Sequence, residues 1–161
     1  MFDVPTVDVP TVEGTAVKLA TTTLIDAPPE TVFDLLADPA KQMLWRDGLV
    51  EHRSASPSVD AGEVGSAVDE VFRKGRAKTE FVVHSELIAA HRPSLYATRI
   101  SHESFAGDVT YHPDVVDGKT RLVAEADMTY QGNVVSRFLS QMAVHHNRKD
   151  MKALVALAEA R

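Results

Sequence analysis

The sequence contains no cysteine, which excludes disulfide bonds, thiol nucleophiles, thiolate metal sites and covalent haem attachment. It also lacks any apolar run approaching the roughly 18 residues of a membrane-spanning helix. Acidic residues outnumber basic ones by 23 to 17, and the net charge of −6 argues against nucleic acid as the main partner. The start, Met1–Pro5, has neither the basic region nor the apolar run of a signal peptide. We therefore expect a cytoplasmic protein without integral membrane association.

Motifs for metals, nucleotides and nucleophilic hydrolysis are missing as well. The seven histidines show no metal-ligand spacing such as HExxH, and the chain contains no GxGxxG, Walker or GxSxG pattern. We expect no metal and no other cofactor. Any chemistry would rest on histidine, tyrosine or carboxylate groups.

The 161 residues, of which 44% are hydrophobic, suit one globular domain with a substantial core. The first residues stand apart, because the pentapeptide Asp-Val-Pro-Thr-Val occurs twice in succession over residues 3–12. Proline at every fifth position forbids a helix and favours extended backbone. We expect residues 1–15 to form an extended arm and residues 16–161 to form the domain. The arm is either flexible, or it adds to a sheet edge or grips a neighbouring subunit, which would give a homodimer.

Proline and apolar residues predict a strand followed by two short helices. Residues 16–25 are rich in Thr, Val and Leu, which favours a strand. Within residues 26–38 two prolines open a short amphipathic helix, which must end before Pro39 because proline disfavours helical geometry in the preceding residue. A second short helix is predicted over residues 39–45, before the turn Asp47–Gly48.

Six further strands, separated by turn residues, are predicted downstream. Asp117–Gly118 is a strong hairpin signal between two of them. Apolar and polar residues alternate over residues 80–87 and 121–130, which indicates an antiparallel sheet with one solvated face. The predicted strands are residues 49–55, 65–74, 77–89, 94–103, 107–115 and 119–130.

The C-terminal part is predicted to be one long helix. Residues 134–159 contain no Gly or Pro, and Asn133 is a suitable N-cap. At 1.5 Å per residue such a helix is about 39 Å long, about the diameter of a domain of this size. It must therefore lie across the apolar face of the sheet.

The stretch Leu24–Pro39, followed by Trp45, resembles the N-terminal pattern of the START-like (SRPBCC) superfamily, which includes Bet v 1-like and polyketide cyclase/dehydrase-like proteins. The shared features are a first strand, an Ala-Pro helix start, a Val-aromatic pair in the helix and the later tryptophan. The resemblance covers residues 16–160 and implies an α+β helix-grip fold. In this fold a curved seven-stranded antiparallel sheet wraps around the long C-terminal helix, with two short helices after the first strand. A cavity between sheet and helix would hold an apolar small molecule.

Residues expected to line this cavity lie at inward strand positions and on one stripe of the long helix. His146 continues the stripe of Phe138 and Met142, so it either faces the cavity as a polar anchor or acid/base, or is solvated where the helix seam shifts. The three tyrosines either hydrogen-bond a ligand or are core residues whose hydroxyls reach the rim. The expected lining is Trp45, Phe81, Val83, Tyr96, Val109, Tyr111, Met128, Tyr130, Phe138, Met142 and His146.

Three residues are candidates for a catalytic role: His146, Tyr111 and Glu70. Glu70 faces inward if Phe72 does, and a shift of one residue in register would turn it to solvent. Arg99 is either an ion-pair partner for Glu70 or solvated.

Three hypotheses about function follow. The preferred one is binding, for transport or sequestration, of a hydrophobic small molecule such as a lipid, a quinone or an aromatic polyketide. The second is a cofactor-independent cyclase, aromatase or dehydratase that folds its substrate in the same cavity and moves protons with one or two polar groups. The third is a module that binds another protein through its sheet or arm.

Overall fold

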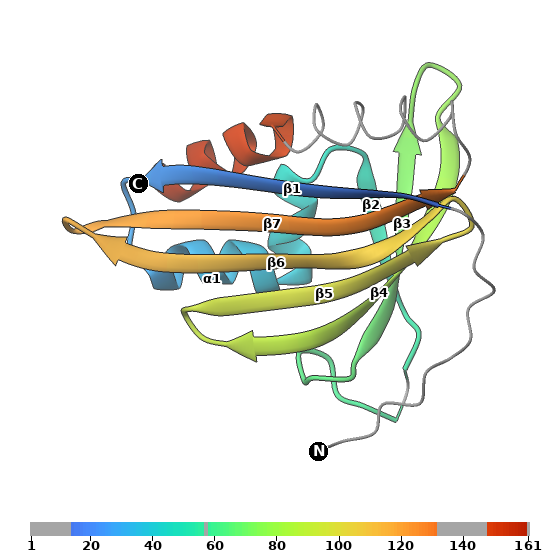
Figure 1. Cartoon of the computed structure of the whole chain (residues 1–161), viewed down its shortest axis with the longest axis horizontal. Coiled ribbons are helices and arrows are strands. Elements are labelled where there is room, and N and C mark those ends of the chain that lie inside the picture. The colour runs from blue at the N-terminus through green and yellow to red at the C-terminus, as the bar shows by residue number, and fades with distance from the viewer. Residues whose placement is uncertain (1–13, 57, 132–147, 161) are drawn as a thin grey trace.

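The computed structural model describes residues 14–56, 58–131 and 148–160 of the chain. A seven-stranded antiparallel sheet carries helices packed on one of its faces (Figure 1). The strand order is β1-β7-β6-β5-β4-β3-β2, so each strand from β2 to β7 pairs with its neighbour in sequence and β1 pairs with β7. The strands are β1 (Gly14–Ile25), β2 (Leu49–Ser54), β3 (Ala67–Lys74), β4 (Thr79–His91), β5 (Leu95–His102), β6 (Phe105–Val116) and β7 (Lys119–Gln131).

The turn between β6 and β7 forms at the predicted Asp-Gly pair. Asp117 has φ +50° and Gly118 has φ +78°, the two positive values that a tight hairpin turn requires. This turn fixes the register of β6 against β7, in which Tyr111 lies opposite Ala124. The α+β fold with seven antiparallel strands, predicted from the sequence, is confirmed.

Two short helices follow β1, with the predicted ends. The first, α1 (Pro29–Ala37), stops at Asp38, because the next residue is Pro39. Asp38 then caps α2 (Pro39–Trp45), and its carboxylate accepts a hydrogen bond of 2.9 Å from the backbone N–H of Ala40.

Residues 148–159 are helical and form the described part of the predicted long helix. Two hydrogen bonds attach this segment to distant parts of the chain. Asp150 accepts from the backbone N–H of Asp47 at 3.0 Å, and Glu159 accepts from that of Asp26 at 3.0 Å. The predicted helical residues 134–147, which include Phe138, Met142 and His146, lie outside the described residues, as do residues 1–13 of the predicted arm.

No helix in the described part of the chain combines the length and apolar character needed to span a membrane.

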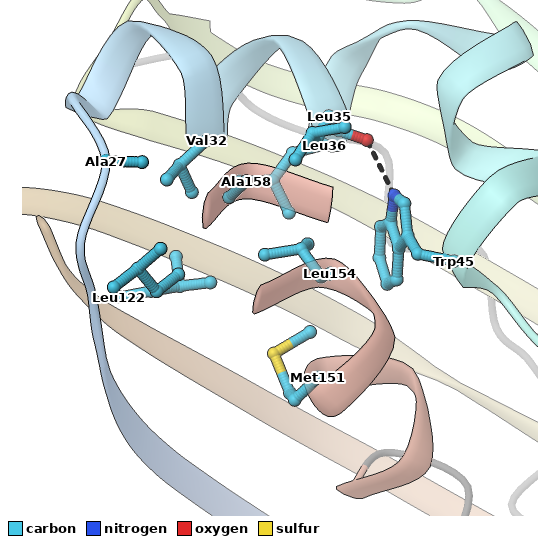
Figure 2. Packing of buried hydrophobic residues seen from close by; sticks show 10 residues of the cluster. Ala27, Val32, Leu35, Leu36, Trp45, Leu122, Met151, Leu154 and Ala158 are labelled. Carbon is cyan, nitrogen blue, oxygen red and sulfur yellow. Dashed lines mark hydrogen bonds between the residues drawn. The ribbon is translucent and has the colours of Figure 1, made fainter. Parts of the chain in front are cut away.

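The main hydrophobic core joins α1, α2, the 148–159 helix and the β1 and β7 strands (Figure 2). Leu154 is fully buried in this core, beside Leu36 of α1 and Leu122 of β7. A buried polar group at its edge is satisfied, since the hydroxyl of Thr120 donates a 2.6 Å hydrogen bond to the carbonyl of Ala27. The core thus fixes the helices over one end of the sheet.

Candidate functional site

A small cavity lies between the short helices and the inner face of the sheet. Its volume is about 80 Å³, room for two or three water molecules or for the polar end of a larger molecule. The lining comes from α1, α2, β3, β5 and β6 and from Arg46, which directly follows α2. The lining residues are Leu36, Gln42, Trp45, Arg46, Glu70, Tyr96, Thr98, Ile100, Val109 and Tyr111.

Four residues of the predicted lining therefore contribute to this cavity: Trp45, Tyr96, Val109 and Tyr111. Trp45 is held in place by a 2.7 Å hydrogen bond from its indole Nε1–H to the carbonyl of Leu35, shown in Figure 2. This bond satisfies the polar end of the indole while its rings remain in the core.

Glu70 points inward. This is the orientation expected for Glu70 when Phe72 also faces inward. Phe72 stacks on Phe81 of β4 with ring centroids 5.1 Å apart, and residues two apart on a strand share a face. Glu70 is buried, and its Oε2 lies 2.7 Å from Nη2 of Arg46. Burial acts to lower the pKa of the Arg46 guanidinium, but the charge and hydrogen bond of Glu70 outweigh it, so that this pKa is raised.

Arg99, the residue considered as a partner for Glu70, is instead on the outer face of the sheet. Its Nε lies 2.9 Å from Oδ1 of Asp108, and the pair is exposed. The partner in the structure, Arg46, was not among the candidates. An arginine just after a helix carries no sequence signal for a buried ion pair with a strand 24 residues later.

Two phenols line the same cavity as the ion pair. The hydroxyl of Tyr96 accepts a 3.3 Å hydrogen bond from Nε2 of Gln42, which also donates to the carbonyl of Leu36 at 2.6 Å. Burial raises the pKa of Tyr96 and raises that of Tyr111 to about 12. Both hydroxyls therefore keep their protons at neutral pH.

Beside the cavity, the inner face of the sheet carries a row of ring side chains, which we call the aromatic row. Neighbouring rings lie between 5.0 and 6.2 Å apart along the row. The three rings in the middle of the row, those of Phe81, His102 and Phe105, are only partly buried. The aromatic row consists of Phe72, Phe81, His102, Phe105 and Tyr130.

The other predicted lining residues that belong to the described part of the chain lie in or near the aromatic row, not in the cavity. Phe81 and Tyr130 belong to the row itself. Val83 is buried in a cluster with Leu49 and Phe72, and Met128 is buried on β7, two residues from Tyr130. The structure thus divides the predicted lining between a polar cavity and an aromatic surface next to it.

His52 is a further ring on the cavity side of β2, where it lies opposite Glu70. Both of its ring nitrogens are buried, and neither has a hydrogen-bond partner among the described residues. Burial lowers the pKa of His52 below its ordinary value. No sequence pattern singles out this residue, since a histidine in a short polar strand is common.

The lowered pKa of His52 predicts a pH-dependent loss of stability. The unfolded chain binds the proton more tightly than the folded one, so the stabilisation is complete above about pH 6.5 and is lost as the pH falls through the folded-state pKa. Between pH 7.5 and 5.5 the wild type should therefore lose more unfolding free energy in urea than His52→Leu. His91→Leu, which removes an exposed imidazole, is the control and should follow the wild type. Equal losses in wild type and His52→Leu would contradict the prediction.

Within the described residues, no group of three or more His, Asp or Glu side chains is placed to hold a metal ion.

Comparison with solved structures shows the same fold in proteins of low sequence identity. Protein CV1439 from Chromobacterium violaceum superposes with a TM-score of 0.73 at 14% identity, over 90% of this chain and 99% of its own. Ara h 8.0201 gives 0.71 at 10% identity, over 89% and 98% of the two chains. The di-domain ARO/CYC BexL from the BE-7585A biosynthetic pathway gives 0.71 at 13% identity, over 91% of this chain and 51% of its own. No curated protein matches the chain.

A family model described as polyketide cyclase/dehydrase and lipid transport matches residues 16–160. Together with the solved structures it confirms the START-like resemblance seen in the sequence, and with it a fold that binds hydrophobic ligands. The chain therefore belongs to the polyketide cyclase/dehydrase and lipid transport family.

Proposed function

We propose that this protein binds a hydrophobic small molecule, as a carrier or by sequestration, with the polar end of the ligand in the cavity and its apolar body along the aromatic row. The observation that supports this most directly is the contact between the two regions. Cζ of Arg46 lies 5.3 Å from the ring centroid of Phe72, and Ile100 both lines the cavity and packs against the cluster around Phe72. A ligand can therefore contact both regions at once.

Partly buried aromatic side chains are the kind of surface that such a ligand would cover. Apolar area removed from water contributes about 25 cal/mol per Å², and ligand sites combine such area with a few placed polar groups. Phe81 and Phe105 supply the area, and the groups around Arg46 supply the polar contacts.

Binding can be tested on delipidated protein by thermal shift with a fatty acid, a sterol, a quinone and an aromatic polyketide. A ligand at 100 times its Kd stabilises the folded state by about 2.7 kcal/mol, which for a domain of this size raises Tm by roughly 5–10 °C. Trp45 is the only tryptophan and lines the cavity, so its fluorescence emission should change over the same range of ligand concentration as the thermal shift. The proposal fails if no ligand class changes either signal.

A pair of valines on β6 provides a matched control for the position of the ligand. Val109 lines the cavity, whereas Val115 is 59% exposed. We expect Val109→Phe to weaken binding at least about tenfold by filling the cavity, and Val115→Phe to leave the Kd unchanged. Equal affinities in both variants would place the ligand elsewhere.

The second candidate function is a cyclase, aromatase or dehydratase, and one observation favours it. Two of the candidate catalytic residues, Glu70 and Tyr111, line the same cavity. A positioned general acid or base typically accelerates a reaction by about 10²–10⁴-fold. Incubating candidate ligands with the protein and analysing the products by liquid chromatography with mass detection separates the two functions. A dehydratase removes one water, a cyclase gives an isomer of equal mass with a different retention time, and a carrier returns the ligand unchanged.

A further inference from the structure

Both ring nitrogens of His52 are buried beside the cavity, although the residue does not line it. His52 lies on β2, at the edge of the sheet, directly opposite Glu70 of β3. A neutral imidazole offers one donor and one acceptor nitrogen, and neither has a partner among the described residues, which costs free energy. A buried polar group left in this state is a sign of a further role.

The charges that face this imidazole come from β3 and from the end of α2. Burial has the largest effect on the pKa of His52 and lowers it, the Glu70 carboxylate raises it, and the Arg46 guanidinium lowers it. Lys41, the charged residue within α2, acts instead on Asp34 of α1. Within the described part of the chain, His52 and Arg46 are therefore the two groups that compete for the Glu70 carboxylate.

The other charges on β2 point away from His52. Neighbouring residues of a strand face opposite sides of the sheet, and Glu51 and Arg53 pair with each other at 3.0 Å on the outer face. Arg53 also approaches Glu80 of β4 at 3.8 Å. The inner side of β2 thus presents His52 to Glu70 without another charged side chain of its own strand.

Arg46 is the member of the ion pair that can turn to solvent. Its side chain is 22% exposed, against 5% for Glu70. The negative charge of Asp150 also acts on it, and its contact from Nη1 to Oε1 of Gln42 is long, at 3.5 Å. A guanidinium that leaves Glu70 therefore gains water and stays within the field of a second carboxylate, whereas the buried Glu70 still needs a cation.

We propose that His52 is a proton-operated second partner of Glu70. When the imidazole takes up a proton from solvent, it replaces Arg46 at the carboxylate, and Arg46 turns to water. Both ring nitrogens then become donors, one to Glu70 and the other toward the backbone of Pro39, which also favours the protonated ring. The exchange keeps the buried pair neutral overall while it cuts the link between the end of α2 and β3. Mild acid thereby loosens the part of the cavity wall that Trp45 and Arg46 form.

The fluorescence of Trp45 tests this exchange without any ligand, so the result does not depend on the proposed function. Trp45 is the only tryptophan and directly precedes Arg46. We expect the emission of the wild type to shift to longer wavelength between pH 7.5 and 5, with unchanged far-ultraviolet circular dichroism and with a midpoint below the ordinary histidine pKa of about 6.5. This midpoint should coincide with the titration of the His52 ring followed by NMR.

Two histidine variants assign the shift. His52→Gln, which stays neutral at every pH, should abolish it. His91→Leu removes an exposed imidazole and should leave it as in the wild type. A shift that persists in His52→Gln comes from another group and overturns the proposal, and so does a wild-type protein whose emission stays constant over this range.

Arg46→Met tests the competition directly, because it removes the repelling charge and leaves the Glu70 carboxylate to His52 alone. The proton affinity of His52, measured by NMR, should rise at least about tenfold. Arg53→Met is the matched control, since it removes the arginine next to His52 in sequence but on the opposite face of the sheet, and it should change that affinity by less than about threefold. Equal proton affinities in wild type and Arg46→Met would show that the two cations do not share the carboxylate and contradict the proposal. If Arg46→Met does not fold, the comparison of wild type with His52→Gln still decides the question.

Discussion

Replacing Arg46 with methionine should lower the free energy of unfolding by about 3–5 kcal/mol, because the change leaves the Glu70 carboxylate buried without its partner. The Arg46 and Glu70 side chains are joined at 2.7 Å and largely removed from solvent. The pair also ties the end of α2 to β3, so the loss affects the contact between helix and sheet as well as the charge. Urea unfolding followed by circular dichroism measures the effect.

Two further variants test whether the lost stability comes from the unpaired buried charge or simply from the removal of an arginine. The double variant Arg46→Met with Glu70→Leu removes both charges and should recover most of the lost stability, since apolar pairs often replace buried ion pairs at no cost. Arg99→Met breaks the exposed pair with Asp108 and should cost less than about 1 kcal/mol. A double variant no more stable than Arg46→Met would show that the buried charge is not the cause.

Leu154→Ala should be about as damaging, with an expected loss of 2–5 kcal/mol from the combined effects of lost burial and the cavity left behind. Leu154 is 0% exposed and lies among α1, β7 and Trp45 in the core of Figure 2. Its neighbours are held by other elements and cannot close in fully around an alanine. Chemical denaturation gives the difference directly.

The control for Leu154 is Leu44, which is 64% exposed on α2. Leu44→Ala removes the same atoms from a helix but should change the stability by less than about 0.5 kcal/mol. A small effect of Leu154→Ala would mean that the 148–159 helix is not an integral part of the core.

The parts of the fold that could be predicted from the sequence are those set by local chemistry. Pro39 ends α1 by steric conflict with the residue before it, and Asp117–Gly118 permits the positive φ values of a tight turn. Strict alternation along β7 assigns its two faces without knowledge of its neighbours.

The cavity was less predictable, because it depends on contacts between residues far apart in the chain. The inward face of β3 is settled by the stacking of Phe72 on Phe81, a cross-strand contact that the ambiguous pattern of β3 did not reveal. Arg46 reaches Glu70 because the end of α2 lies beside β2, the strand paired with β3, and nothing in the residues around Arg46 indicates that contact. Local pattern thus indicated four lining residues and left Glu70 as one of two alternatives, but it gave no indication of Arg46.

The pairing of β1 with β7 has a consequence for how the chain folds. Ile25 lies opposite Thr120 and Gly14 opposite Gln131, so these partners are about a hundred residues apart in sequence, whereas β2 to β7 are joined by local turns. Closing long loops costs entropy before the contact is gained, which slows such pairings. During synthesis β1 leaves the ribosome long before β7, the strand with which it pairs, so we expect the hairpins from β2 to β7 to assemble first and β1 to dock last.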